Sequence, residues 1–88
     1  MGRLMHRGKP RNQSSPLACH IGIQLLKLRQ KHQVTMREVG DQAGISTAYI
    51  CEIENGQRSV GAAVLWKLSQ AFDVPIGYWF KGYTEEGE

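Results

Sequence analysis

The segment TMREVGDQAGISTAYICEIEN, residues 35–55, constrains the fold more than any other part of the 88-residue sequence. Thr35 and Glu38 have the T-x-x-E spacing of a capping box, in which each side chain satisfies a free N–H group at the start of a helix. Gly44 can adopt the left-handed conformation that ends a helix, and Ser46 can cap the helix that follows. The segment therefore predicts two short helices joined by a tight turn.

The apolar residues of this segment share one side of the helix pair, and they are Val39, Ala43, Ile45, Ile50 and Ile53. Two helices of this length cannot bury those side chains alone, so further helices must pack against them. The polar face of the second helix is then free to enter a DNA major groove. This arrangement is a helix-turn-helix motif.

The remaining helices follow from caps and apolar spacing. Ser15 and Pro16 are a typical cap and first helical position, and proline at position 75 disfavours a helical conformation at Val74. After this break, a last helix is expected to return Ile76, Trp79 and Phe80 to the core. The five expected helices span residues 16–32, 36–43, 47–55, 61–72 and 76–81. No alternating strand pattern of useful length is visible, so the predicted fold class is all-α, a compact five-helix bundle over residues 15–82.

The charges are distributed unevenly around a formal net charge of +3. Residues 1–14 are expected to form a flexible basic arm that contains Arg3, Arg7, Lys9 and Arg11 and no acid. Residues 83–88 are expected to be a disordered acidic tail. A basic excess suits a polyanion such as DNA, although solvated tails without any partner are an alternative.

Several classes of protein are not expected. Cys19 and Cys51 form no C-x-x-C pair and have no histidine at ligand spacing, so neither a metal site nor a disulfide framework is predicted. A reduced, cytoplasmic, nucleoid-associated protein is the simplest interpretation. No stretch approaches membrane-spanning length, and no secretory signal is visible. No paired carboxylates, nucleophile–base set or phosphate loop indicates an enzyme.

Five short motifs occur in one register: the pair Leu28-Arg29, the capping box, the turn G-I-S at 44–46, Y-I-x-x-I-E-N-G at 49–56 and L-x-x-A-F-D-V-P at 68–75. In this combination the chain resembles the lambda-repressor-like family of helix-turn-helix domains, which includes Cro and the xenobiotic-response-element-type regulators. The resemblance covers roughly residues 21–82. It implies five helices, a homodimer on double-stranded operator DNA, control of transcription and no cofactor.

The chain departs from the family pattern at four places, one of which is Trp66, where the family often has leucine. Gln33 stands where the family usually has the glycine that ends the first helix, and a left-handed conformation there costs on the order of 1 kcal/mol. Met36 replaces a glutamine that touches a phosphate in the family, which puts that contact in doubt. The helix at 47–55 contains no lysine or arginine.

The resemblance places the base-reading positions on Thr47, Ala48 and Glu52, and helical spacing puts Cys51 on the same exposed face. Thr47 and Ala48 can contact a thymine methyl group, and Glu52 can accept from a cytosine N4 group. Alternatively, Glu52 is a solvated acid that weakens binding. Cys51 is interpreted as a small neutral filler rather than a redox switch.

Phosphate contacts would fix the register on DNA without reading sequence. The candidates are Arg37, Ser46, Tyr49, Asn55 and Arg58. Arg37 can equally lie on a solvated face. The basic arm either wraps the duplex, as in some family members, or is a loose end.

Two further roles come from the resemblance. Arg29 and Glu54 are expected to form a partly buried ion pair that supports the fold. Tyr78, Trp79 and Lys81 are expected to contribute to a dimer interface. The alternative is that Trp79 and Phe80 are both core residues and only Tyr78 is exposed. The expected function is a sequence-specific DNA-binding transcriptional regulator. The alternatives are the antitoxin of a toxin–antitoxin pair, which also binds a protein, and a pure protein-interaction module.

Overall fold

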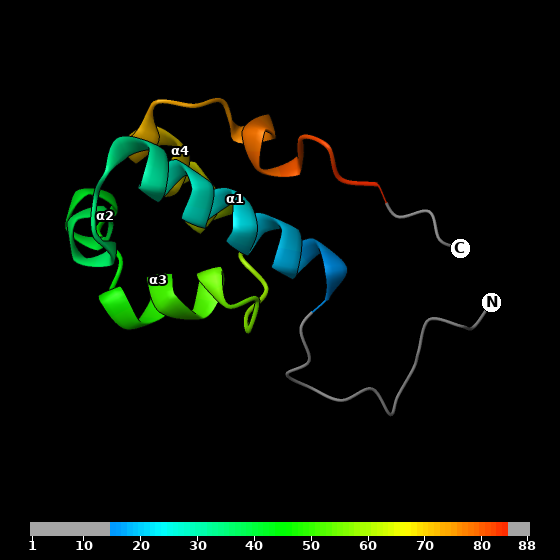
Figure 1. The fold of residues 1–88 in the computed structure, drawn as a ribbon, viewed down its shortest axis with the longest axis horizontal. Helices are drawn as coiled ribbons and strands as arrows, with labels where there is room; N and C mark the ends of the chain where they lie inside the picture. The colour runs from blue at the N-terminus through cyan, green and yellow to red at the C-terminus, as the bar shows by residue number, and fades with distance from the viewer. Residues whose placement is uncertain (1–14, 85–88) are drawn as a thin grey trace.

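The computed structural model describes residues 15–84 and contains only helices over that range (Figure 1). In chain order these are α1 (Pro16–His32), α2 (Met36–Ala43), α3 (Thr47–Glu54), α4 (Ala62–Phe72) and a short 3-10 helix, η1 (Ile76–Phe80). The all-α prediction is confirmed, and the expected helix bounds agree to within a residue. The last element differs in type, because it is a single short 3-10 segment rather than an α-helix.

The predicted caps are present at the starts of the first three helices. Ser15 Oγ accepts from the Ala18 N–H at 3.0 Å. In the capping box, Thr35 Oγ1 accepts from the Glu38 N–H at 3.0 Å, while Glu38 Oε1 accepts from the Thr35 N–H at 2.8 Å. Ser46 Oγ accepts from the N–H of the third residue of α3 at 3.1 Å. Each cap satisfies an N–H group that has no partner inside its own helix.

Three helices end in the left-handed conformation. Gly44 ends α2 with φ of 74°, as its sequence position predicted. Gln33 ends α1 with φ of 58°, so this position keeps the left-handed backbone without the glycine that would adopt it at no steric cost. Asp73 follows α4 with the same φ; the end of the helix at Phe72 was predicted, but this left-handed conformation was not. Aspartate tolerates this conformation better than most residues.

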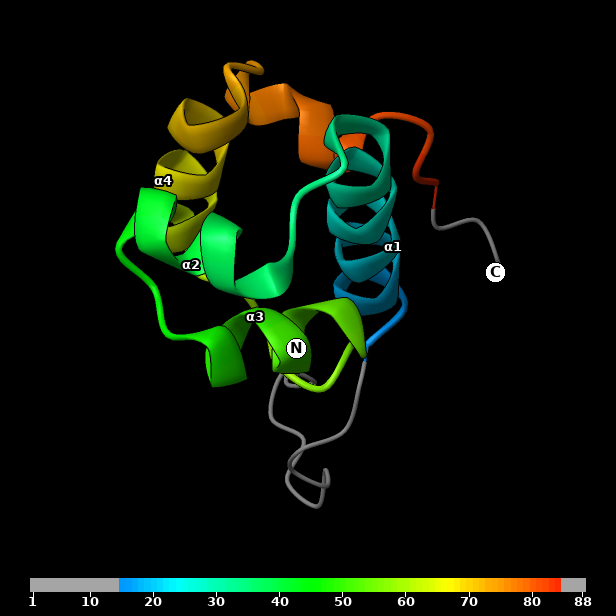
Figure 2. The same cartoon turned by 60° about the vertical axis from the view of Figure 1, so that its left-hand side comes forward.

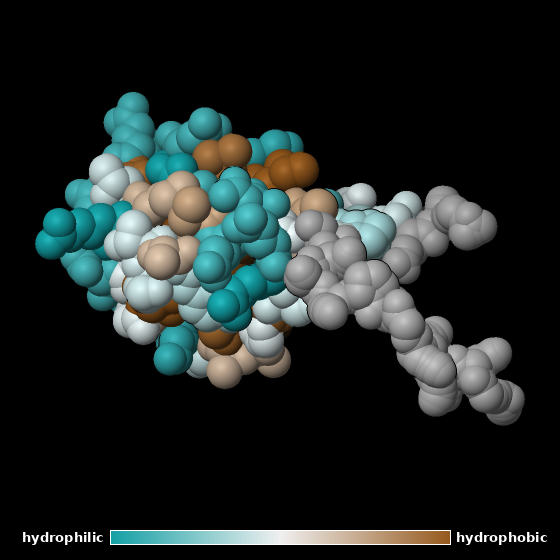
Figure 3. All heavy atoms as spheres, turned by 90° about the horizontal axis from the view of Figure 1, so that it is seen from below, coloured by the Kyte–Doolittle hydropathy of each residue, from teal (hydrophilic) through white to brown (hydrophobic). Residues whose placement is uncertain are grey.

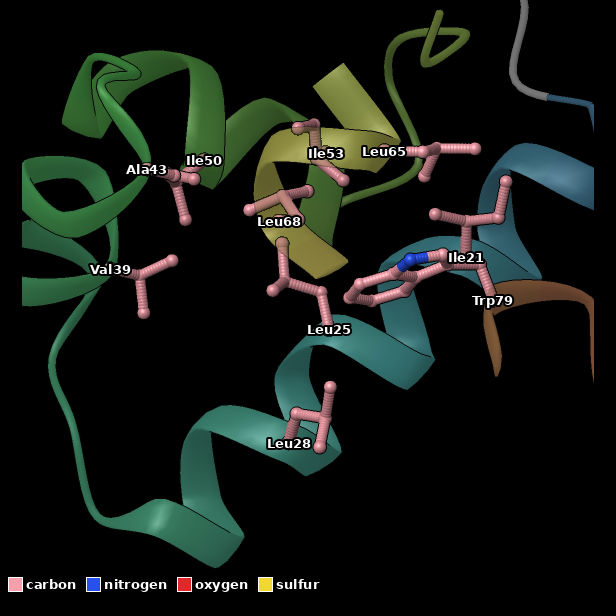
Figure 4. Packing of buried hydrophobic residues seen from close by; sticks show 10 residues of the cluster. All are labelled: Ile21, Leu25, Leu28, Val39, Ala43, Ile50, Ile53, Leu65, Leu68 and Trp79. Atoms are coloured by element: carbon pink, nitrogen blue, oxygen red, sulfur yellow. The ribbon is translucent and has the colours of Figure 1, made fainter. Parts of the chain in front are cut away.

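The helices surround a single core. α1 packs against α3 and η1, and α2 packs against α3 and α4 (Figures 1 and 2). The buried cluster draws on all five elements and comprises Ile21, Leu25, Leu28, Val39, Ala43, Ile50, Ile53, Leu65, Leu68 and Trp79 (Figure 4). The Trp79 indole N–H donates to Ser69 Oγ at 2.8 Å, and that hydroxyl donates to the Leu65 carbonyl oxygen at 2.8 Å. The polar atoms buried with the indole are therefore satisfied.

The expectation that three residues of the last helix return to the core is wrong for two of them. Trp79 is fully buried, but Ile76 and Phe80 remain 41% and 42% exposed. Ile76 and Phe80 are the first and last residues of this five-residue element, at the edge of the fold, whereas the Trp79 indole reaches the core and donates to Ser69 Oγ.

Two glycines set how closely α3 approaches its neighbours. A Cβ atom at Gly22 of α1 would collide with the carbonyl oxygen of Ile53 and lie 2.9 Å from that of Glu54. A Cβ atom at Gly40 of α2 would collide with the carbonyl oxygen of Ile45. Close backbone packing thus holds α3 against α1 at Gly22 and holds the turn before α3 against α2 at Gly40.

Candidate nucleic-acid interface

The start of α3 is presented to solvent. Ser46, Thr47 and Ala48 are exposed, while Ile50 and Ile53 on the opposite side of the helix are fully buried. In Figure 1, α3 lies along the lower edge of the molecule, and Figure 3 views that side, where hydrophilic side chains and side chains of intermediate hydropathy are prominent. One face of α3 is therefore held by the core and the other is free to contact a partner.

Glu52 does not stand alone on this surface. Its Oε1 atom accepts from Arg58 Nε at 2.5 Å, although Arg58 lies six residues away in the loop after α3. The two side chains are 40% and 52% exposed. Sequence reasoning treated them separately, as a base-reading or solvated acid and a phosphate-binding cation, and it missed their pairing.

Arg58 has a second contact on α3. Its guanidinium carbon lies 5.0 Å from the centroid of the Tyr49 ring, within the range of a cation–π interaction. The Tyr49 ring is half-buried and packs against the core. The loop thus brings a cationic group onto a helix that contains none, and we call these three residues the Tyr49–Glu52–Arg58 cluster.

Cys51 and Asn55 contact each other on the next turn. Asn55 Nδ2 donates to Cys51 Sγ at 3.6 Å, and the thiol side chain is half-buried. Asn55 itself is exposed at the end of the helix.

The other candidates lie around α3. Arg37 is exposed in the first turn of α2. Met36 is half-buried and packs against the core, and its side chain offers no polar N–H or O–H group at the position where the family has a glutamine. The basic residues Arg3, Arg7, Lys9 and Arg11 lie outside the described residues.

Arg29 and Glu54 form the expected ion pair. Arg29 Nε and Nη2 donate to the two carboxylate oxygens of Glu54 at 2.6 and 3.0 Å, and Nη1 donates to the Val34 carbonyl oxygen at 3.2 Å. The hydrogen bond with Glu54 raises the pKa of Arg29 above its usual value, against the lowering effect of burial. Both side chains are largely buried, so the pair links α1 to the C-terminal end of α3 within the fold.

The expected dimer surface is only partly exposed. Trp79 is fully buried because its indole fills the core, so its expected place in the core is confirmed and its expected role in a dimer interface is wrong. Tyr78 is half-buried, and Lys81 is exposed. The exposed apolar side chains of this region are instead Ile76 and Phe80 on η1 and Trp66 on the neighbouring α4, which is 55% exposed.

Other kinds of site are not visible in residues 15–84. No group of three or more histidine, cysteine or acidic residues could hold a metal ion there, and no helix in this range is long and apolar enough to cross a membrane. An open cavity of about 620 Å³ lies between α2 and the ends of α1 and α4. Glu38, Asp41 and Asp73 line this cavity, and none of its lining residues belongs to α3.

Comparisons with known proteins agree with this geometry. A model of the helix-turn-helix family matches residues 25–79. The chain is 40% identical over 68 residues to the HTH-type transcriptional repressor RghR of Bacillus subtilis. The aligned region covers 74% of this chain and 50% of the relative. It is 27% identical over 73 residues to an uncharacterized HTH-type transcriptional regulator of Sinorhizobium medicae, covering 83% of this chain and 52% of the relative. The chain thus spans about half the length of these curated relatives.

Solved structures of similar proteins share the fold. The restriction-modification controller protein C.AhdI from Aeromonas hydrophila superposes with a TM-score of 0.69 at 25% identity, over 72% of this chain and 96% of that chain. The clp gene regulator ClgR from C. glutamicum superposes with a TM-score of 0.68 at 25% identity, over 73% of this chain and 83% of that chain. Of the proteins named above, RghR is a transcriptional repressor and ClgR is a gene regulator. The chain belongs to the lambda-repressor-like helix-turn-helix family.

Proposed function

We propose that this protein binds double-stranded DNA sequence-specifically and regulates transcription, with α3 as the recognition helix. The observation that carries the proposal is the placement of α3. The left-handed turn at Gly44 separates it from α2, its buried face is fixed by Ile50 and Ile53, and its N-terminal residues are exposed. In a helix-turn-helix protein, these N-terminal residues meet the base edges.

The side chains at the start of α3 suit close approach to bases. Thr47 and Ala48 are small and exposed, so the helix can lie deep in the major groove. A threonine hydroxyl can hydrogen-bond a base, and both side chains can contact a thymine methyl group.

Cationic and polar groups around α3 would hold the duplex in register. We assign phosphate contacts to the exposed Ser46 and Arg37, to the Tyr49 hydroxyl and to Asn55. The basic residues at 3–11 of the arm would add sequence-independent affinity through counterion release.

A homodimer is part of the proposal. Exposed Trp66, Ile76 and Phe80, with Tyr78 and Lys81, offer apolar surface on α4 and η1 for an isologous contact. A two-fold dimer would place two copies of α3 on operator half-sites about one helical turn apart.

A protein-interaction module of the same fold is less well supported. That alternative drew on the negative charge of Glu52 on the recognition helix. The ion pair with Arg58 balances this charge, so the surface of α3 is not acidic overall.

Selection from random double-stranded DNA tests the proposal, followed by affinity measurements on the enriched and a scrambled duplex at several salt concentrations. We expect an enriched sequence, and an affinity that falls with salt by about 0.9 in log–log slope for each phosphate neutralised. A48D should abolish this binding, since it places a carboxylate against the bases.

The matched control is A63D. Ala63 is exposed and is the second residue of α4, just as Ala48 is the second residue of α3. An acid in the first turn stabilises either helix to a similar degree. Equal effects of the two substitutions, or no enriched sequence at all, would contradict the proposed function.

A further inference from the structure

In the Tyr49–Glu52–Arg58 cluster an acid occupies α3 and an arginine of the following loop folds back onto it. We propose that Glu52 does not read a base itself but orients Arg58, and that Arg58 reads a guanine in the major groove. This inference rests on the proposed function, since it names the specificity-determining residue of the same surface.

The first step is the geometry of the ion pair. Arg58 uses Nε to reach Glu52 Oε1 at 2.5 Å, and the structure gives its two Nη groups no hydrogen bond among the described residues. These groups form the outer edge of the guanidinium, which can donate two parallel hydrogen bonds. Guanine offers the matching pair of acceptors, O6 and N7, and arginine bound to both is the commonest specific contact in the major groove.

The second step is the support beneath the guanidinium. The Tyr49 ring lies 5.0 Å from the guanidinium carbon and packs against the core. Tyr49 and Glu52 are three residues apart on α3, so they share a side of the helix. The guanidinium is therefore held on the recognition helix itself by two contacts, although its backbone belongs to the following loop.

The third step distinguishes base reading from phosphate binding. For a phosphate contact, positive charge contributes to affinity through counterion release and needs no fixed orientation. An acidic partner would only reduce that contribution. An acid beside an arginine improves a contact that depends on orientation, as a bidentate contact with a base edge does. The pair is half-exposed, so the outer edge of the guanidinium is open to a duplex.

The test measures relative affinity for the four base pairs at each position of the selected operator, for the parent, R58K, E52Q and the double variant. Lysine keeps the charge but cannot reproduce the planar donor pair. We expect R58K to lose guanine preference at one position by roughly 5- to 150-fold, the range of one good base contact. E52Q should weaken the preference at that same position, and the double variant should lose no more than R58K.

R37K serves as the comparison, because it alters an exposed arginine of α2 that is assigned to phosphate and should change no base preference. Three results would overturn the inference. One is a uniform loss of affinity in R58K with every preference kept, which would make Arg58 a phosphate contact. Another is an E52Q effect at a different position that adds to that of R58K, which would make Glu52 a base reader. A parent that selects no sequence would overturn the proposed function as well.

A measurement on the free protein separates the inference from DNA binding. The hydrogen-bonded Nε–H of Arg58 should give a ¹H–¹⁵N signal that exchanges slowly with water in the parent, and faster in E52Q. Because both side chains are half-exposed, thermal unfolding of E52Q should stay close to that of the parent. Equal exchange in the two proteins would show that Glu52 does not hold Arg58, whatever the DNA experiments give.

Discussion

The guanidinium of Arg29 donates to both carboxylate oxygens of Glu54, at 2.6 and 3.0 Å, and so ties the last turn of α1 to the last residue of α3. A third hydrogen bond reaches the Val34 carbonyl oxygen in the loop before α2. Arg29 is 18% exposed and Glu54 is 5% exposed. Together with the close contact at Gly22, this pair fixes α3 to α1 at its C-terminal end.

Removing one partner of this pair should be costly. We expect R29Q to lower the free energy of unfolding by about 3–5 kcal/mol, because it leaves the carboxylate of Glu54 buried without its counter-charge. Urea denaturation measures the change. R58Q is the matched control, since it breaks an exposed arginine–glutamate pair that should contribute about 0–1 kcal/mol. Similar losses in the two variants would mean that burial does not distinguish the two pairs.

Alanine should be harmful at Gly40, although it usually stabilises a helix interior by about 0.5–1 kcal/mol relative to glycine. The added Cβ would collide with the Ile45 carbonyl oxygen, so we expect G40A to lose about 1–3 kcal/mol of stability, as in overpacked sites. G77A is the control, because a Cβ atom there meets nothing within 4 Å. Calorimetric unfolding that shows G40A to be as stable as G77A would contradict this account of the packing.

The exposed side chain of Phe80 should contribute to dimerisation. We expect the parent to sediment as a dimer at micromolar concentration and F80E to shift toward the monomer, because the substitution places a charge in an apolar contact. I23E is the control, since Ile23 is also exposed but lies on α1. A parent that is monomeric both free and on DNA, or equal effects of the two substitutions, would exclude this interface.

Deleting residues 1–12 should weaken DNA binding and flatten its salt dependence. The deletion removes four cationic side chains, and the log–log slope should fall by about 0.9 for each phosphate that the arm no longer neutralises. Titrations of the selected duplex at several salt concentrations give the slope. An unchanged slope would show that the arm does not bind the duplex.

The sequence predicted much of the framework because local chemistry determines it. The capping box at Thr35 and Glu38 and the turn at Gly44 depend only on neighbouring residues, and both occur as predicted. The left-handed Gln33 followed from the family pattern. Asp73 escaped prediction because its left-handed conformation is tolerated rather than required by the residue type.

The features that sequence reasoning missed depend on tertiary structure. The pairing of Glu52 with Arg58 requires the loop after α3 to fold back, which no helical periodicity indicates. One signal was available, because a recognition helix without basic residues needs a cation from elsewhere, and Arg58 is the nearest one in sequence. Among residues 76–84 only Trp79 is fully buried, and the apolar pattern of Ile76, Trp79 and Phe80 did not distinguish it from the other two.

The most direct test of the central claim is a ¹H–¹⁵N titration of the labelled protein with the selected duplex. If α3 enters the major groove, the largest amide shifts should fall on residues 46–52, with a marked shift of the Arg58 side-chain Nε–H. Amides beside the acidic cavity, at Asp41 and Asp73, should change little. The largest shifts at that cavity, with the signals of Thr47 and Ala48 unmoved, would contradict the assignment of α3 as the recognition helix.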